Sequence, residues 1–445
     1  MNITRTAALA AVLFSGRWAI AQDASPQQML TQLESLRERI AELEAQQSGP
    51  TAAEVDRVVQ QVLTDAQTRS VFLTQTTGLT AGYDKSRFFI RSDDGNWLLM
   101  PSFIFQARYA ASFSHDEDKT EAGFEIRRMR LIFEGNAFNP QFQYKFQWES
   151  ANGTGNVFLQ DAWIRYSFAD RFALEAGQFK DGVHHEEASA DQYTLAADRS
   201  YINAVLGGGN IDRIQGVMLM YDNKQNFRAN FVVHDGANTK NTDFTDTGGG
   251  SSFVGITNMN CGLSLRAEYL AMGAWKQYDD FTALGNKEDL LVLGAGADWS
   301  HSGDSQVLFH TADAQFENAT GLGLYGAFYG IWRQADFSVP VPDPTGDHYD
   351  YGFLVQAGQM LTDKIEAFGR YEFLKLDDGL LVPGTEDTLN VITVGANYYM
   401  SRHNVKFTAD LQYLPNGATY AAPGVDVLQS AQGQLVFRLQ AQLVL

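Results

Sequence analysis

Five cationic side chains share the polar face of segments in which polar and apolar residues alternate. Such alternation is typical of β-strands, whose successive side chains point to opposite faces. Guanidinium and ammonium groups gathered on one face attract small anions, and the fork of an arginine suits the oxygens of phosphate. The candidate anion-binding residues, on four segments that follow one another along the chain, are Arg108, Arg128, Arg130, Lys145 and Arg165.

Three carboxylates lie on the same faces and offer a second interpretation. Glu134, Glu149 and Asp161 have the same parity as the cations of their segments, so they could pair with them. Unpaired cations would form an anion site, whereas paired charges would leave a transverse field with mild selectivity. The mixed, paired arrangement is the one that the sequence favours, with these three residues as acidic partners.

Two further motifs resemble chemical sites without the context that such sites need. Residues 321–326 match G-x-G-x-x-G, but the pattern continues as a strand and no helix follows, which argues against a dinucleotide site. Residues 184–187 read His-His-Glu-Glu, which lacks the H-E-x-x-H spacing of a helical metal site. We therefore expect no catalytic residues, no metal and no cofactor.

The charged faces belong to a series of sixteen alternating segments that runs from Trp97 to the C-terminus. Many of them span about 10 to 15 residues, which suits a tilted membrane-crossing strand better than a soluble strand of about 5 to 6. An even number of strands allows a closed antiparallel barrel. The expected strands lie near residues 98–113, 124–138, 140–150, 156–168, 171–180, 213–221, 226–235, 262–273, 289–299, 304–316, 321–335, 349–361, 364–376, 387–400, 404–414 and 431–445.

The composition agrees with a barrel and excludes other classes of protein. The chain has 445 residues, a formal net charge of −20 and a single Cys, which argue against nucleic acid as the main partner and against a disulfide framework. No stretch reaches the ~18 uninterrupted apolar residues of a membrane helix, so any membrane span must be a β-barrel. The expected fold class is all-β: a 16-stranded antiparallel transmembrane β-barrel with an N-terminal α-helical coiled-coil segment.

The N-terminal part of the chain has a different pattern. Residues 1–21 combine Arg5, a short apolar stretch and the cleavage pattern Ala-Ile-Ala, and predict a signal peptide. Residues 22–67 predict a periplasmic coiled coil or helical stalk, followed by a linker over residues 68–96 and the barrel domain over residues 97–445. The coiled-coil repeat, with its 4-3 spacing of apolar positions, consists of Met29, Leu33, Leu36, Ile40 and Leu43.

Four short stretches within about residues 90 to 236 carry a family resemblance. Residues 123–135 read G-F-E-I-R-R-M-R-L-I-F-E-G, residues 159–166 read L-Q-D-A-W-I-R-Y, and residues 177–180 read G-Q-F-K. Together with Ser-Asp-Asp-Gly at residues 92–95, they resemble motifs of the phosphate-selective porin family (porins O and P). The resemblance implies a trimeric, 16-stranded outer-membrane channel, specific for phosphate in some members.

The connections between the expected strands differ in length, as the two ends of a porin barrel do. Short turns, for example at Asn139-Pro140, suit the periplasmic side, and longer polar connections such as residues 236–254 suit the extracellular side. The longest connection, residues 181–212, is not polar throughout. A loop of that size is usually functional, and in a porin it could fold inward and narrow the pore.

Pattern and resemblance together predict an outer-membrane porin for the passive diffusion of small hydrophilic solutes or ions, and they leave an anion or phosphate preference open. The predicted location is the outer membrane, with the N-terminal segment in the periplasm. The expected partners are outer-membrane lipid, permeant ions or phosphate, and further copies of the chain in a homotrimer. The alternative is a barrel anchor whose coiled coil contacts the cell wall and tethers the envelope.

Overall fold

The computed structural model describes residues 78–445, except 85–86, 116–119, 151–154, 209–211, 238, 240–258, 303–304, 335–342, 344–345 and 382–384, and single helical positions between residues 31 and 60. The chain divides into two units, Met1–Thr77 and Gly78–Leu445. Apart from those single positions, the expected signal peptide and coiled coil lie outside the described residues. In the part of the chain that is described, no helix combines the length and the apolar character needed to span a membrane.

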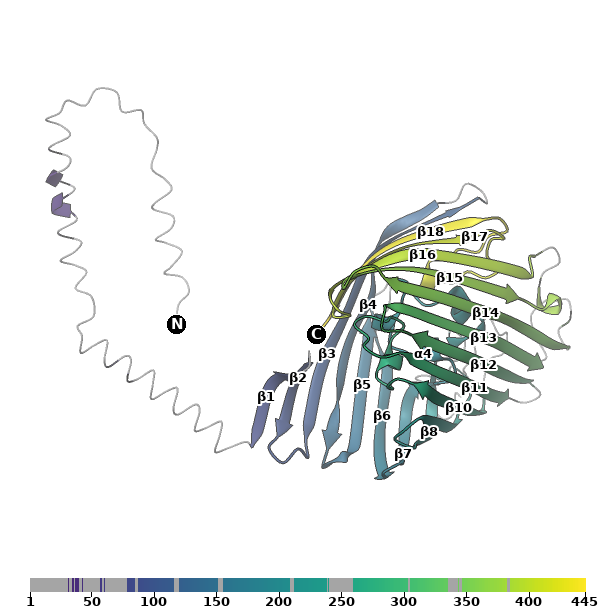
Figure 1. Ribbon diagram of the computed structural model, residues 1–445, viewed down its shortest axis with the longest axis horizontal. Coiled ribbons are helices and arrows are strands. Elements are labelled where there is room, and N and C mark those ends of the chain that lie inside the picture. The colour runs from purple at the N-terminus through teal and green to yellow at the C-terminus, as the bar shows by residue number, and fades with distance from the viewer. Residues whose placement is uncertain are drawn as a thin grey trace. The chain divides into compact units, whose positions relative to one another are not determined.

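Sixteen antiparallel strands, β3 to β18, form a closed barrel (Figure 1). Each strand pairs with its neighbour in sequence, and the last strand closes the barrel by pairing with the first, from Gln434 opposite Ser114 to Val444 opposite Ile104. Closure leaves no unpaired edge, which lipid could not hydrogen-bond. The predicted barrel is therefore confirmed; the largest shift of a strand start is at β4, which begins at Thr120.

The strand bounds are as follows. The barrel consists of β3 (Leu98–Ser114), β4 (Thr120–Ala137), β5 (Asn139–Ser150), β6 (Val157–Ala169), β7 (Phe172–Lys180), β8 (Arg213–Asp222), β9 (Phe227–His234), β10 (Cys261–Met272), β11 (Leu290–Ser302), β12 (Ser305–Glu317), β13 (Leu322–Gln334), β14 (Asp347–Met360), β15 (Ile365–Lys375), β16 (Thr388–Ser401), β17 (Val405–Leu414) and β18 (Gln434–Val444).

The barrel wall is apolar outside and polar inside. In β18, Leu439 is 50% exposed and its neighbour Arg438 is 0% exposed. A soluble protein would expose the arginine and bury the leucine, so this inversion is typical of a strand between lipid and a polar lumen. The same alternation of exposed and buried residues runs along β14 and β15.

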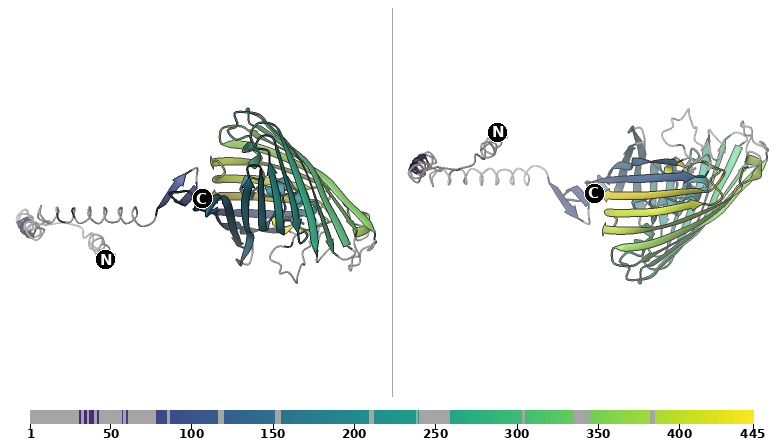
Figure 2. Two further views of the ribbon diagram at one scale, coloured as in Figure 1. Left: turned by 90° about the horizontal axis from the view of Figure 1, so that it is seen from below. Right: turned by 90° about the horizontal axis from the view of Figure 1, so that it is seen from above.

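A hairpin of two short strands precedes the barrel. β1 (Leu79–Asp84) pairs with β2 (Arg87–Ser92), and β2 joins the barrel through only two residue pairs with the start of β3. The hairpin projects beyond the end of the barrel at which the C-terminus lies (Figure 2). It occupies part of residues 68–96, where the sequence indicates a linker, because six alternating positions are too few to distinguish a strand from a loop.

Residues 181–208 and 212, between β7 and β8, fold into the barrel and are called the inward segment below. They contain α4 (His185–Ala188), the 3₁₀ turn η3 (Asp191–Tyr193) and α5 (Tyr201–Leu206), whose N-cap Ser200 accepts a hydrogen bond from the Asn203 amide. In α5, Tyr201, Ile202 and Leu206 are buried against β13, β14 and β15. Gly352 of β14 makes room for this packing, because a Cβ there would lie 2.6 Å from the Ile202 Cδ1 atom.

Residues 273–289, between β10 and β11, also turn into the barrel, but from the opposite end, and are called the mouth segment. They contain the 3₁₀ turn η4 (Gln277–Asp279) and bury Tyr278 and Phe281. The remaining short helical turns, η5 (Asp378–Leu380) and η6 (Pro423–Val425), lie in connections at the long-loop end.

Candidate functional site

Three of the predicted cations bind carboxylates of the inward segment. Arg108 forms ion pairs with Asp198 and with two other carboxylates. The Arg128 Nη2 atom lies 2.6 Å from Asp198 Oδ1 and 3.2 Å from Asp191 Oδ1, and Arg130 pairs with Asp191. These arginines therefore hold the inward segment against the barrel wall, which sequence patterns alone did not reveal.

A fourth arginine joins this contact because β4 contains a bulge. Gln106 of β3 faces Arg128 and the next residue, Ala107, faces Ile126, so Arg127 has no partner in the register. The extra residue turns the Arg127 side chain inward, and its Nε atom lies 3.0 Å from Asp198 Oδ2. Strict alternation assigns Arg127 to the lipid face. The pair of adjacent arginines, Arg127 and Arg128, is the feature of the sequence that indicates a bulge here.

Asp191 and Asp198 stay ionised in this environment. Both are buried, and burial raises the pKa of each carboxyl. For Asp198 the guanidinium groups of Arg127, Arg128 and Arg108 outweigh burial, and for Asp191 three neighbouring arginines and a lysine do so, holding both pKa values well below the usual range.

Asp161, one of the predicted acidic partners, is shared by two cations. Its Oδ2 atom lies 2.7 Å from Lys145 Nζ, and its Oδ1 atom lies 2.9 Å from the Nε atom of Arg213 at the start of β8. Arg213 also contacts Asp212, with 2.7 Å between its Nη1 atom and Asp212 Oδ1, so two cations and two carboxylates meet at this point of the wall.

The other predicted carboxylates have different partners. Glu149 Oε2 lies 2.5 Å from Arg130 Nε, as expected for a partner on the neighbouring strand. Glu134 instead pairs with Arg87 of the β1–β2 hairpin, and no lumen cation among the ion pairs of the described residues binds it. Arg165 pairs with Glu175 of β7, with 2.5 Å between the Nη2 and Oε2 atoms.

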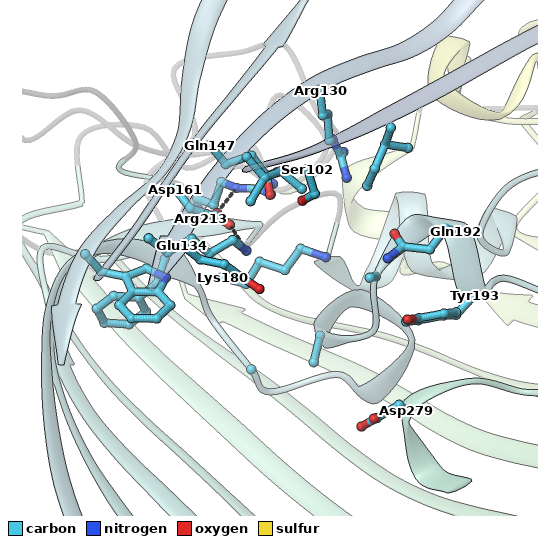
Figure 3. Close-up of a pocket in the computed structure, with 18 of the residues that line it drawn as sticks. Ser102, Arg130, Glu134, Gln147, Asp161, Lys180, Gln192, Tyr193, Arg213 and Asp279 are labelled. Carbon is cyan, nitrogen blue, oxygen red and sulfur yellow. Dashed lines mark hydrogen bonds and ion pairs between the residues drawn. The ribbon is translucent and has the colours of Figure 1, made fainter. Parts of the chain in front are cut away.

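A cavity of about 570 Å³ lies between the wall of strands β3–β9 and the inward segment (Figure 3). Lys180, at the end of β7, reaches its rim and donates hydrogen bonds to the carbonyl oxygens of Glu187 (2.6 Å) and Ser189 (3.1 Å). Lys180 and Arg213 were not among the predicted site residues, because each sits where a strand meets the inward segment. The charged lining comprises the cations Arg87, Arg130, Lys145, Arg165, Lys180 and Arg213 and the carboxylates Glu134, Asp161, Glu175 and Asp279.

A smaller cavity of about 210 Å³ continues the route towards the long-loop end. Arg130 and Arg213 line both cavities. The smaller one is also lined by Arg127 and Arg128, which lie nearer the long-loop end of β4. Two polar cavities thus lie along one wall of the barrel, and Arg130 and Arg213 stand between them.

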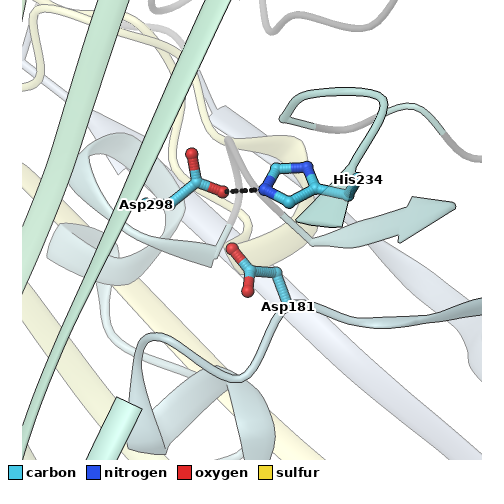
Figure 4. A group of neighbouring side chains, drawn as sticks. All are labelled: Asp181, His234 and Asp298. Carbon is cyan, nitrogen blue, oxygen red and sulfur yellow. Dashed lines mark ion pairs between the residues drawn. The ribbon is translucent and has the colours of Figure 1, made fainter. Parts of the chain in front are cut away.

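The inward segment begins in a buried polar cluster of Asp181, His234 and Asp298 (Figure 4), whose ligand-type atoms lie within 4.8 Å of one another. The Gly236 amide donates to His234 Nδ1 at 3.0 Å, so the proton of a neutral ring sits on Nε2, 3.1 Å from Asp298 Oδ2. A metal would need that nitrogen's lone pair. The hydrogen bonding therefore favours a proton over a metal ion between these groups.

The His-His-Glu-Glu stretch of the inward segment packs against the lumen wall. His184 stacks on Tyr329 and His185 on Tyr278, with ring centroids 4.9 and 3.8 Å apart. Burial lowers the pKa of His185 to about 4, so its ring is neutral at pH 7. The side chains of the stretch have separate partners and do not converge on one point.

Comparison with known proteins places these features in context. Residues 103–328 match the family described as "Phosphate-selective porin O and P". An uncharacterised protein of Aquifex aeolicus (strain VF5) is 21% identical over 332 residues, which are 72% of this chain and 73% of the relative.

Among solved structures, the chain is similar to the anion-selective porin from Comamonas acidovorans, with a TM-score of 0.55 and 12% identity over 78% of this chain and 99% of that one. It is also similar to Salmonella typhi OmpF in complex with daunomycin, with a TM-score of 0.53 and 13% identity over 82% of this chain and 100% of that one. These similarities show the fold.

Proposed function

Because the chain belongs to the phosphate-selective porin O and P family, which it matches over residues 103–328, we propose that this outer-membrane porin conducts small anions, inorganic phosphate among them, in preference to cations. The family and the closed 16-stranded barrel support the outer-membrane channel. The preference for anions is inferred from the charges along the path.

The observation that carries the proposal is the excess of cationic over carboxylate side chains around the 570 Å³ cavity. Six cationic side chains and four carboxylate side chains line it. A cleft lined mainly by one sign of charge raises the local concentration of the opposite ion, and Lys or Arg residues at a constriction are how anion pores select.

The anion path differs from the one expected from the sequence. Arg108 and Arg128 are occupied by carboxylates of the inward segment, which supports the paired interpretation for β3 and β4. The proposed path lies instead along Lys145, Lys180 and Arg213 of the cavity lining. These cations have carboxylate neighbours of their own, since Lys145 and Arg213 share Asp161, Arg213 also contacts Asp212, and Lys180 lies 3.8 Å from Glu187 Oε1.

Reversal potentials across a salt gradient in planar bilayers test the proposal. The wild type should be anion-selective. Lys180→Glu replaces a basic side chain of the lining with a carboxylate and should lower the chloride-to-potassium permeability ratio at least about fivefold, since charges 4 Å apart interact by about 1 kcal/mol even in water. The matched control is Lys364→Glu in the exposed β14–β15 turn, outside the cavity lining. A cation-selective wild type would refute the proposal.

The homotrimer and the periplasmic position of the N-terminal segment are proposals supported by the family resemblance. Chemical cross-linking of the purified protein, with and without residues 22–67, tests whether that segment is needed for trimers. The alternative function, an envelope tether that contacts the cell wall, depends on the same residues, which apart from single helical positions lie outside the described part of the chain.

A further inference from the structure

The mouth segment is an exception among the connections at its end of the barrel. One residue separates β4 from β5 there, and three separate β16 from β17, whereas the mouth segment runs from residue 273 to 289. Short connections mark the periplasmic end of such barrels, so the mouth segment enters the lumen from the periplasmic side.

The mouth segment is fastened at both sides of the periplasmic mouth. Near its start, the Trp275 Nε1–H donates to the carbonyl oxygen of Gln225 in the β8–β9 turn at 3.0 Å, and the Arg228 guanidinium lies 4.2 Å from the centre of the Trp275 ring. Near its end, Arg402 in the β16–β17 turn donates to the Leu284 carbonyl oxygen at 2.9 Å. The segment therefore crosses the mouth.

Tyr278, at the centre of the mouth segment, joins it to the inward segment. Its ring stacks on His185 of α4 with centroids 3.8 Å apart and 4° between the planes. The Tyr278 hydroxyl lies 2.9 Å from Arg266 Nη2 and 3.3 Å from Asp313 Oδ1 on the lumen wall. Because these groups are buried, the stacked rings of Tyr278 and His185 support the inward segment from the periplasmic side.

The next residue, Asp279, is directed elsewhere. It is exposed and lines the large cavity, and Figure 3 shows it near Tyr193 and away from the Asp161–Arg213 pair. The other three carboxylates among the described lining residues belong to barrel strands. Asp280, the residue after Asp279, has a different neighbour, because its Oδ2 atom lies 3.2 Å from His403 Nε2.

We propose that the mouth segment is a second constriction, which supports the inward segment through Tyr278 and sets Asp279 as a charge-selective residue at the periplasmic exit. This inference rests on the proposed anion conduction. A channel must bind its ion strongly enough to admit it and weakly enough to release it. A carboxylate at the exit of a cationic cavity lowers the affinity for anions there, and so speeds their release into the periplasm.

The charge-selective role is tested with Asp279→Asn in planar bilayers. Removing an exposed charge that acts through water should raise the anion-to-cation permeability ratio about two- to threefold, and should lengthen the block that added inorganic phosphate causes in the chloride current. Glu288→Gln is the matched control, because it removes the same charge from the same segment outside the cavity lining.

The outcomes separate this inference from the proposed function. If Asp279→Asn shifts the reversal potential no more than Glu288→Gln does, Asp279 does not select ions. If the wild type prefers cations but Asp279→Asn still moves the ratio towards anions, the placement of Asp279 holds and only the anion preference of the whole channel fails.

The supporting role is tested with Tyr278→Ala, which removes the stack, against Tyr278→Phe, which keeps the ring and loses only the hydroxyl. Tyr278→Ala should give a larger and noisier single-channel conductance, and Tyr278→Phe should stay close to wild type. Folding is checked first by the shift in electrophoretic mobility on heating. A folded Tyr278→Ala barrel with wild-type conductance would overturn the role, and so would an equal effect of the two variants.

Discussion

The two faces of the inward segment are held to the barrel by different forces. Towards β3 and β4, Asp191 and Asp198 bind arginines of the wall. Towards β13–β15, Tyr201, Ile202 and Leu206 are buried among apolar side chains. The two polar cavities lie along the charged face and the apolar core lies on the other, so one segment separates a polar part of the lumen from an apolar part.

The difference matters because the two kinds of contact respond differently to change. Burying a large apolar side chain contributes about 1.5–3 kcal/mol and requires no partner of defined charge. A buried ion pair stabilises a fold little more than an apolar pair of similar size would. Removing one member, however, leaves the other charge buried without a partner and destabilises the fold by about 3–5 kcal/mol. The charged face is thus the more sensitive to substitution by neutral residues, and the apolar face to the introduction of charge.

The largest effect is expected on the apolar face, from Ile202→Asp. A carboxylate would be buried beside Glu372, whose Oε2 atom accepts from the Ile202 amide at 2.8 Å, and losing the packing of Ile202 alone costs about 2–5 kcal/mol. The inward segment should leave the lumen and single-channel conductance should rise severalfold. Ile202→Val should leave conductance unchanged; a charged variant with wild-type conductance would mean that the apolar face does not hold the segment.

A smaller effect is expected on the charged face, from Asp198→Asn. The change keeps the size of the side chain and leaves Arg108, Arg127 and Arg128 short of one buried negative charge, at about 3 kcal/mol. We expect a moderate rise in conductance together with a stronger anion preference, measured as the reversal potential. Glu288→Gln, which removes an exposed carboxylate outside the cavity lining, is the control. If conductance rose without any change in selectivity, these arginines would not reach the path.

The smallest effect is expected from acidification. Because the pKa values of Asp191 and Asp198 lie well below their usual range, their ion pairs contribute stability above the unfolded pKa of about 4 and lose it only as pH falls through the lower folded values. The ion pairs of Asp191 and Asp198 should therefore persist from pH 7 to about 4. Burial raises the pKa of Asp426, another partner of Arg108, to about 6, so a pH series of bilayer recordings should show at most a small step near pH 6 and no further change down to about pH 4. A large rise in conductance between pH 6 and 4 would show that Asp191 and Asp198 do not hold the charged face.

The barrel could be predicted from the sequence because its determinants are local. Each strand carries its own alternation of polar and apolar residues, and the lumen face follows from parity: Arg108, Arg130, Glu149 and Asp161 all lie on the polar face as expected, and all are buried. The bulge at Arg127 is an exception to that parity. One extra residue in β4 moves the following side chains to the opposite face of the strand, and the alternation of polar and apolar residues does not reveal it.

The partners of these charges could not be predicted in the same way. Asp198 meets Arg108 across 90 positions of sequence, and the contact depends on how the inward segment folds inside the barrel. Lys180 and Arg213 lie at strand ends, where alternation stops, so the pattern assigns them no face. The alternation of polar and apolar residues identifies the strands of the barrel wall. A site between the wall and a loop depends on tertiary packing, which this local pattern does not contain.

The pairing of β18 with β3 has a consequence for how the protein is made. The first and last strands of the barrel meet along Ile104–Ser114 and Gln434–Val444, so the strand that seals the cylinder is synthesised after the other fifteen strands of the barrel. A chain truncated before Gln434 would carry two unsatisfied edges that lipid cannot solvate. Biogenesis must therefore keep every earlier strand out of the bilayer, or bound by other proteins, until β18 has been synthesised.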